Sequence, residues 1–319
     1  MTSKEVAKSI DVPKFPEHIH CEQDGKRIVI KLSERAVGCA DEKNANMQED
    51  EAAFEAWALL LHEKTQREVL LDVQEGVHLK DIDQLPLKHY GRFLYRALRF
   101  SEGFGWFKLS EPIKKKADDL KKLLKDERTI NNVPNSKNDE GDSNKLEAQV
   151  EKVLEEMGVP FLPEVDLHRQ LPVGLFKSDV KSNNNIFTGG KSAIDLWGID
   201  GDAFHLIELK AGGNKKLGII SEMFFYANYA YDVFCNGRFG GEAFTINQEL
   251  GIRGYQEILN RRPAAVCAHT LVEKGKEHPA LQRALTALRE YKHDRIMFDG
   301  TVNTHDICME ITIDSLPNP

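Results

Sequence analysis

The feature that most constrains the fold is the stretch Ser192–Gly212, SAIDLWGIDGDAFHLIELKAG, in which two apolar runs flank an Asp-Gly pair. Asp-Gly between such runs is a strong signal for a two-residue hairpin loop, because a type I′ turn needs a positive φ at both central positions. The runs also carry three ionisable residues, Asp195, Glu208 and Lys210. The stretch therefore predicts a hairpin that holds charged groups within a largely buried sheet.

The turn determines which side chains of this hairpin share a face. If the Asp-Gly pair forms the loop, Asp195 lies opposite Leu206 and diagonal to Glu208. Lys210 shares that face because side chains alternate along a strand. A loop with an odd number of residues would send Asp195 to the other face. We therefore expect the three charged groups to cluster on one side of the sheet.

Two carboxylates beside a lysine are costly as structure alone, because unpaired buried charge is strongly disfavoured. A hard divalent cation removes the repulsion, since Mg²⁺ binds oxygen ligands and usually combines one or two carboxylates with a substrate phosphate. The lysine can then orient or deprotonate a metal-bound water, or stabilise charge on phosphorus. This chemistry fits phosphodiester hydrolysis. The plainer alternative is a cross-strand ion pair on a solvated face, which the apolar neighbours of these residues disfavour.

An aspartate on one strand of a hairpin, followed after twelve residues by Glu-x-Lys on the next, resembles the PD-(D/E)XK nuclease superfamily, the restriction-endonuclease-like fold. Asp195 matches the aspartate of the motif, and Ile194 stands where its loosely kept proline would be. Glu208 matches the acidic position, and Lys210 matches the lysine. The resemblance covers about residues 145–298 and leaves the N-terminal half unexplained.

The resemblance implies a ligand set for Mg²⁺ or Mn²⁺. Asp195 and Glu208 would bind the metal, together with the backbone carbonyl of Leu209. The family usually has a helix before the hairpin that supplies another glutamate, and Glu147 matches that position. Glu147 also has a plainer interpretation, as one of several exposed helix glutamates. Lys210 would position and activate the attacking water.

Two further groups of residues carry weaker expectations. Many family members have Gln-x-x-x-Tyr on the helix after the lysine strand, whereas this chain has Glu222 and Tyr226, a departure at the first position. Packing is the alternative role for Tyr226. Basic residues that could contact nucleic-acid phosphates, or could simply be solvated, are Lys215, Lys216, Arg253, Arg261 and Arg262.

The segment 129–144 is almost entirely Asn, Asp, Ser, Gly and Pro, which is typical of turns or a linker. We place a domain boundary there, with a separate α+β N-terminal domain over 1–128 and a nuclease-like α/β domain, a mixed central sheet flanked by helices, over 145–319. Residues 161–185 look rich in loops. Hydrophobic spacing predicts strands at 26–32, 67–73, 263–271 and 295–298, and helices at 51–64, 89–100, 111–128, 145–157, 217–234 and 279–291.

Composition limits the class of protein. A hydrophobic content of 41% and a charged content of 29% are those of an ordinary globular chain. No apolar run reaches the roughly 18 residues of a membrane span, and no signal peptide is visible, so we expect a cytoplasmic protein with no membrane partner. The five cysteines are widely spaced and form no zinc or redox motif. A net charge of −8 argues against a generally basic coat for nucleic acid, although a local basic groove remains compatible with it.

These observations favour a metal-dependent nuclease that cuts DNA, with restriction, repair, recombination and defence all open as roles. The alternative is a catalytically inactive module that keeps the nuclease fold and binds nucleic acid or a protein partner. An RNA-directed nuclease is a third interpretation. For the N-terminal half, substrate recognition, formation of a homodimer and sensing of a signal stay open.

Overall fold

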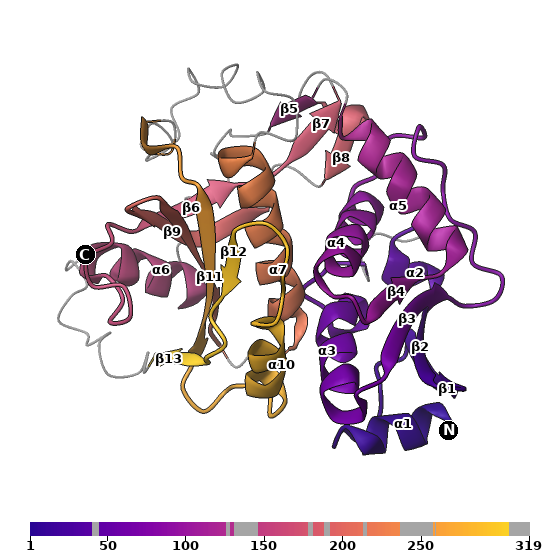
Figure 1. Cartoon of the computed structure of the whole chain (residues 1–319). Helices are drawn as coiled ribbons and strands as arrows, with labels where there is room; N and C mark the ends of the chain where they lie inside the picture. The colour runs from indigo at the N-terminus through magenta and orange to yellow at the C-terminus, as the bar shows by residue number, and fades with distance from the viewer. Residues whose placement is uncertain are drawn as a thin grey trace.

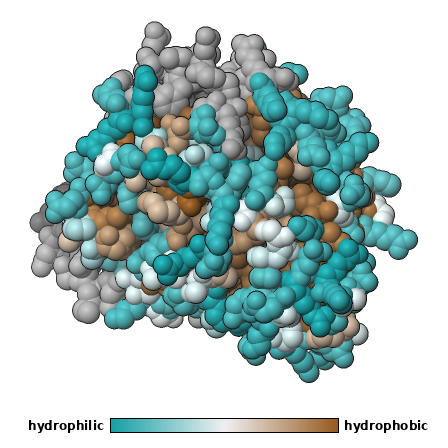
Figure 2. Space-filling view, in the orientation of Figure 1, coloured by the Kyte–Doolittle hydropathy of each residue, from teal (hydrophilic) through white to brown (hydrophobic). Residues whose placement is uncertain are grey.

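The structure is a computed structural model, and it describes residues 1–39, 45–125, 128–130, 146–177, 181–187, 192–212, 216–236, 258 and 260–305. The fold is α/β with mixed sheets (Figure 1). One sheet belongs to the N-terminal half and a larger one to the C-terminal half, and helices from both halves lie between them. Hydrophilic residues cover most of the visible face, with smaller hydrophobic areas between them (Figure 2).

The N-terminal sheet has the strand order β1-β2-β3-β4. Strands β1 and β2 are antiparallel, whereas β2, β3 and β4 run parallel. Their apolar residues contribute to one core together with the helices of this half. The bounds are β1 Ile19–Asp24, β2 Arg27–Leu32, β3 Glu68–Val73, β4 Phe107–Leu109, α1 Ser3–Ser9, α2 Glu34–Val37, the 3₁₀ helix η1 Asp50–Ala52, α3 Phe54–Thr65, α4 His89–Gly103 and α5 Glu111–Leu123.

The C-terminal sheet has the order β12-β11-β10-β9-β6, and β13 also pairs with β11. Strand β9 is antiparallel to both β6 and β10, whereas β10, β11 and β12 run parallel to one another. A third, small sheet has the order β5-β7-β8. The bounds are β5 Arg128–Ile130, β6 His168–Pro172, β7 Leu175–Lys177, β8 Asn185–Phe187, β9 Ala193–Asp200, β10 Ala203–Lys210, β11 Ala265–Glu273, β12 Ile296–Phe298 and β13 Asn303–His305.

Helices cover both faces of the C-terminal sheet. Helix α7 (Gly218–Ala230) is mostly apolar and buried at every residue, and it packs on β10 and β11. On its other side it contacts α3 and α4, while α10 (Leu281–Leu288) contacts α3. Helix α6 (Leu146–Met157) packs on the opposite face of the sheet through Val150 and Leu154. Within the described part of the chain, no helix combines the length and apolar character that crossing a membrane requires.

The core between the two sheets joins both halves of the chain. A single cluster of buried apolar residues runs from the N-terminal sheet through α3 and α4 to α7, α10 and β11. Helix α7 continues into a turn of π-helix, η3 (Tyr231–Cys235). The domain boundary at 129–144 stays a prediction, because residues 131–144 lie outside the described residues.

Each strand and helix predicted from hydrophobic spacing is present, with ends that differ by a few residues. Two predictions were wrong. The linker was expected to begin at Thr129, but β5 occupies residues 128–130 and pairs with β7. The passage 161–185 was expected to be loop, but it contains β6, β7, the 3₁₀ helix η2 (Ser182–Asn184) and the start of β8. These strands are short, and partners elsewhere in the chain stabilise them rather than their own periodicity.

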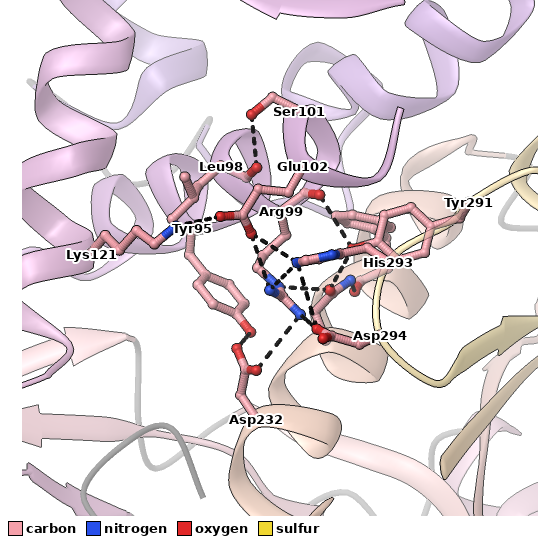
Figure 3. A network of polar contacts seen from close by, with 12 residues as sticks. Tyr95, Leu98, Arg99, Ser101, Glu102, Lys121, Asp232, Tyr291, His293 and Asp294 are labelled. Carbon is pink, nitrogen blue, oxygen red and sulfur yellow. Dashed lines mark hydrogen bonds and ion pairs between the residues drawn. The ribbon is translucent and has the colours of Figure 1, made fainter. Parts of the chain in front are cut away.

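A buried arginine on α4 ties the two halves together (Figure 3). Arg99, whose side chain is 2% exposed, donates from Nε to Asn228 Oδ1 at 2.9 Å. It also donates from Nη1 to Glu102 Oε2 at 3.1 Å. Its Nη2 forms ion pairs with Asp294 and, at 3.6 Å, with Asp232 Oδ1. Since Asn228, Asp232 and Asp294 all belong to the C-terminal half, this one guanidinium links α4 to three points of that half.

The same network makes a carboxylate sensitive to acid. Burial alone would raise the pKa of Glu102, but hydrogen bonds with His293 and Lys121 and the charge of Arg99 outweigh it and lower the pKa to about 2. A carboxyl with a depressed folded-state pKa contributes stability that is present above its unfolded pKa, near 4.5, and is lost as the pH falls towards 2.

We therefore expect Glu102→Gln to lower the free energy of unfolding at pH 7, with a difference from wild type that shrinks as the pH falls from 5 to 3. Urea unfolding at several pH values measures this difference. The control is Asp24→Asn, at an exposed pair with Arg27, which should change the free energy by no more than about 0.5 kcal/mol. A Glu102→Gln effect that stays constant with pH would contradict the assignment.

Candidate active site

The predicted hairpin is present, but its register differs from the expected one by two residues. Asp200 pairs with Ala203, and Trp197 rather than Asp195 lies opposite Leu206. The loop is therefore Gly201-Asp202 instead of Asp200-Gly201. Gly201 has a φ of +56°, and it is the first central residue, where a type II′ turn takes glycine. The prediction failed because both Asp-Gly and Gly-Asp are acceptable two-residue loops.

The shift leaves the shared face unchanged, because two residues are one full period of a strand. The paired ladder ends at Leu196 and Ile207, so the next position along both strands brings Asp195 beside Glu208. The Asp195 carboxylate accepts a hydrogen bond from the backbone N–H of Leu209 at 2.9 Å. Asp195 and Glu208 therefore lie next to each other, closer than the diagonal relation that the sequence predicted.

The centre of the cluster is a carboxylate without a hydrogen-bond donor. Glu208 is fully buried, and neither of its side-chain oxygens has a hydrogen-bond partner among the described residues. Lys210, with 7% of its side chain exposed, lies with Nζ 3.0 Å from Glu222 Oε2, in an ion pair that lacks hydrogen-bond alignment. Burial of a polar group without such partners costs about 1–3 kcal/mol, and more for a charged carboxylate, which a purely structural site would be expected to avoid.

Helix α6 contributes two more carboxylates. Glu147 Oε1 accepts from the backbone N–H of Ala211 at 3.3 Å, at the end of β10, as expected for a glutamate of the site. Glu151, one helical turn further on, is buried and accepts from Gln170 at 2.7 Å. Burial and the charge of Asp195 raise the pKa of Glu151 to about 8. The sequence reasoning passed over Glu151, although its spacing from Glu147 places both on one helix face.

Helix α7 brings Glu222 and Tyr226 to the same cluster. Both are buried, and Glu222 contacts Lys210 as described above. Burial together with the charges of Glu222 and Glu208 raises the pKa of Tyr226 well above its usual value. From α4, the buried Arg92 reaches this side of the site and donates to Ser192 Oγ at 3.1 Å. Arg92 could not be predicted as a neighbour of the site, because its helix lies in the other half of the chain.

The charges of the cluster are strongly coupled. Burial raises the pKa of Asp195 to about 7, although the residue is partly exposed, and Glu222 and Glu147 add to this while Lys210 opposes it. Burial and the neighbouring Asp195 raise the pKa of Glu208 well above its usual value. Burial would lower the pKa of Lys210, but the surrounding carboxylates raise it, so Lys210 is an ammonium ion. The cluster thus holds more carboxylates than its single lysine can neutralise.

The donor set fits a hard divalent cation. Asp195 and Glu208 offer adjacent carboxylate oxygens, and those of Glu208 have no donors to lose. No group of three or more His, Cys, Asp or Glu residues is arranged as a ready-made metal cage in the part of the chain that the structure describes. Mg²⁺ commonly binds through one or two carboxylates and keeps several waters, so it does not require such a cage. The proposed contribution of the Leu209 carbonyl stays a prediction.

Of the basic residues expected to contact phosphates, the structure describes Lys216, Arg261 and Arg262. Lys215 and Arg253 lie outside the described residues. Lys216 is exposed and pairs with Glu49 at 2.6 Å. Arg261 donates to the backbone oxygen of Ile199 at 3.2 Å, and Arg262 is its exposed neighbour. Ile199 is at the turn end of β9, about 13 Å along the strand from Asp195, so these two arginines lie at the wrong end of the hairpin to flank the carboxylates.

Comparison of the chain with protein-family models, with curated proteins and with solved structures gave no match. The likeness to the nuclease superfamily therefore depends on the residues themselves. The structure brings Asp195, Glu208 and Lys210 together with Glu147 and Glu222, and it adds Glu151 to them.

Proposed function

We propose that this chain is a divalent-metal-dependent nuclease that hydrolyses phosphodiester bonds in DNA, built on a restriction-endonuclease-like core. The observation that carries the proposal is the fully buried Glu208, whose oxygens have no hydrogen-bond donor within the described residues, beside Asp195 and Lys210. The mixed sheet, with α6 on one face and α7 on the other, is compatible with such a core.

Each residue of the cluster has a role in this proposal. Asp195 and Glu208 would hold Mg²⁺ or Mn²⁺, with Glu147 and the Leu209 carbonyl as further oxygen donors. When bound, the metal supplies Lewis-acid stabilisation of the phosphate and a more acidic water. Lys210 is an ammonium ion in the cluster, so it donates hydrogen bonds to the attacking water or the phosphate and stabilises the negative charge that develops there.

The partial exposure of Asp195 and Glu147 suits an approach of substrate from the α6 side of the cluster. Glu208, Lys210 and Glu222 lie deeper, where water is excluded and electrostatic interactions are stronger.

The test is cleavage of plasmid DNA, single-stranded DNA and RNA by the purified protein with Mg²⁺, with Mn²⁺ and with EDTA. We expect metal-dependent DNA cleavage that Glu208→Ala abolishes and that Glu22→Gln, on the exposed edge strand β1, retains. Cleavage of RNA alone would change the substrate. Binding of nucleic acid without cleavage under any of these conditions would indicate an inactive nuclease-fold module and overturn the proposal.

A further inference from the structure

A short segment of the N-terminal half, residues 46–50, docks on the start of helix α7. Asp50 Oδ1 accepts a hydrogen bond from the backbone N–H of Leu217 at 2.6 Å. Gly218 lies so close that a Cβ at this position would be 2.0 Å from the backbone oxygen of Gln48. Only glycine permits this approach, so the segment is held directly against the helix that carries Glu222.

From this docked segment a chain of polar contacts leads to the catalytic lysine. Asn46 Nδ2 donates to Gln48 Oε1 at 3.1 Å, which orients the Gln48 amide. Gln48 Nε2 then donates to Glu222 Oε1 at 2.5 Å. The other oxygen of Glu222 lies 3.0 Å from Lys210 Nζ. The two oxygens of Glu222 are therefore divided between an amide from the N-terminal half and the ammonium of β10.

This division determines where Glu222 holds the lysine. Glu222 is 3% exposed, so water does not readily replace a lost partner. With Oε1 occupied by Gln48, Oε2 stays directed at Lys210. If the amide were absent, both oxygens would be drawn to the ammonium ion, and Lys210 would move away from Glu208.

We propose that Gln48 is a positioning residue of the active site that acts on Lys210 through Glu222; this inference rests on the proposed nuclease function. The N-terminal half thus completes the active site of the C-terminal half. It supplies an amide that donates to Glu222.

The first experiment uses Gln48→Glu, which places a second carboxylate in contact with that of Glu222 and removes the amide donor. We expect kcat for DNA cleavage to fall about 100-fold, because small displacements of a catalytic group have effects of this size, while KM changes by less than about threefold. The matched control is Glu49→Gln, in the same segment, which should keep wild-type kcat because its exposed pair with Lys216 does not contact the cluster. Circular dichroism and thermal unfolding show that each variant is folded.

The decisive variant is the exchange Gln48→Glu with Glu222→Gln. The exchange restores one amide and one carboxylate at the contact. The amide at position 222 would donate its N–H to the carboxylate at position 48 and direct its oxygen at Lys210. We expect kcat to recover at least about tenfold over Gln48→Glu alone, which is the size of coupling seen for residues in contact. A role in folding alone would restore stability without restoring kcat.

The outcomes separate this inference from the proposed function. If the wild-type protein cleaves DNA and Gln48→Glu cleaves equally fast, or if the exchange gives no recovery, the positioning role is wrong and the nuclease assignment stands. If the wild-type protein shows no cleavage with any metal, the proposed function and the positioning role both fail. A double-mutant cycle on urea unfolding would then still show whether the Gln48–Glu222 contact exists.

Discussion

Lys210→Met is expected to lower kcat for DNA cleavage by about 10²–10⁴-fold at saturating metal and substrate. Methionine keeps the length of the side chain but removes the Lys210 ammonium from beside Asp195, Glu208 and Glu222. Single-turnover cleavage measured against wild type tests this. Lys31→Met, at an exposed pair with Glu22 on the distant sheet, is the control and should retain full activity.

Stability distinguishes a catalytic cluster from a structural one. Lys210→Met leaves the carboxylates without their countercharge and should cost about 3–5 kcal/mol in the free energy of unfolding. Glu208→Gln should be equally inactive but at least as stable as wild type without metal, because a neutral amide replaces a buried carboxyl whose pKa is raised by burial and by Asp195. Urea unfolding gives both values. A Glu208→Gln variant that keeps full activity would show that the cluster is not catalytic.

Arg99→Met is expected to lower the free energy of unfolding by about 3–5 kcal/mol. The substitution leaves Asp232, Asp294 and Glu102 buried or half-buried without the guanidinium that joins them. The free energy of unfolding in urea measures this loss. Arg27→Met, at an exposed pair with Asp24, should cost less than about 1 kcal/mol.

The same variant tests how the two halves depend on each other. Because Arg99 joins α4 to three residues of the C-terminal half, its loss should weaken protection of amide hydrogens in both halves. Hydrogen exchange confined to α4 and its own sheet would indicate that the shared core, rather than Arg99, couples the halves.

The sequence was sufficient for the elements with strong periodicity. The helices at α4, α6 and α7 and the strands at β2 and β10 follow from the spacing of their apolar residues, and so does the common face of Asp195, Glu208 and Lys210. Side chains alternate between the two faces of a sheet, so a register error of two residues leaves each side chain on its predicted face. The face of the charged residues was therefore right although the pairing register of the hairpin was wrong. The short strands β6, β7 and β8 could not be predicted, because their pairing depends on partners that local sequence does not specify.

The site was predictable only where it is local in sequence. The spacing of the nuclease motif connects Asp195, Glu208 and Lys210 within the hairpin, and Glu147 was expected because the resemblance implies a glutamate on the preceding helix. The Gln48–Glu222 contact joins residues that are 174 positions apart. Arg92 likewise reaches Ser192 across 100 positions. Contacts of this kind arise from the packing of α4 and the 46–50 segment on α7, and the hydrophobic spacing of the sequence does not predict them.

The close approach at Gly218 bears on how relatives of this chain could be recognised. A hairpin with Asp, Glu and Lys is a loose signature that unrelated chains produce by chance. A relative that retains the contact between positions 48 and 222 must also retain glycine at position 218, since any larger side chain would collide with the backbone at 48. Glutamine, glycine and glutamate at these three positions, taken together with the hairpin, form a fingerprint that spans both halves and is much harder to match by accident.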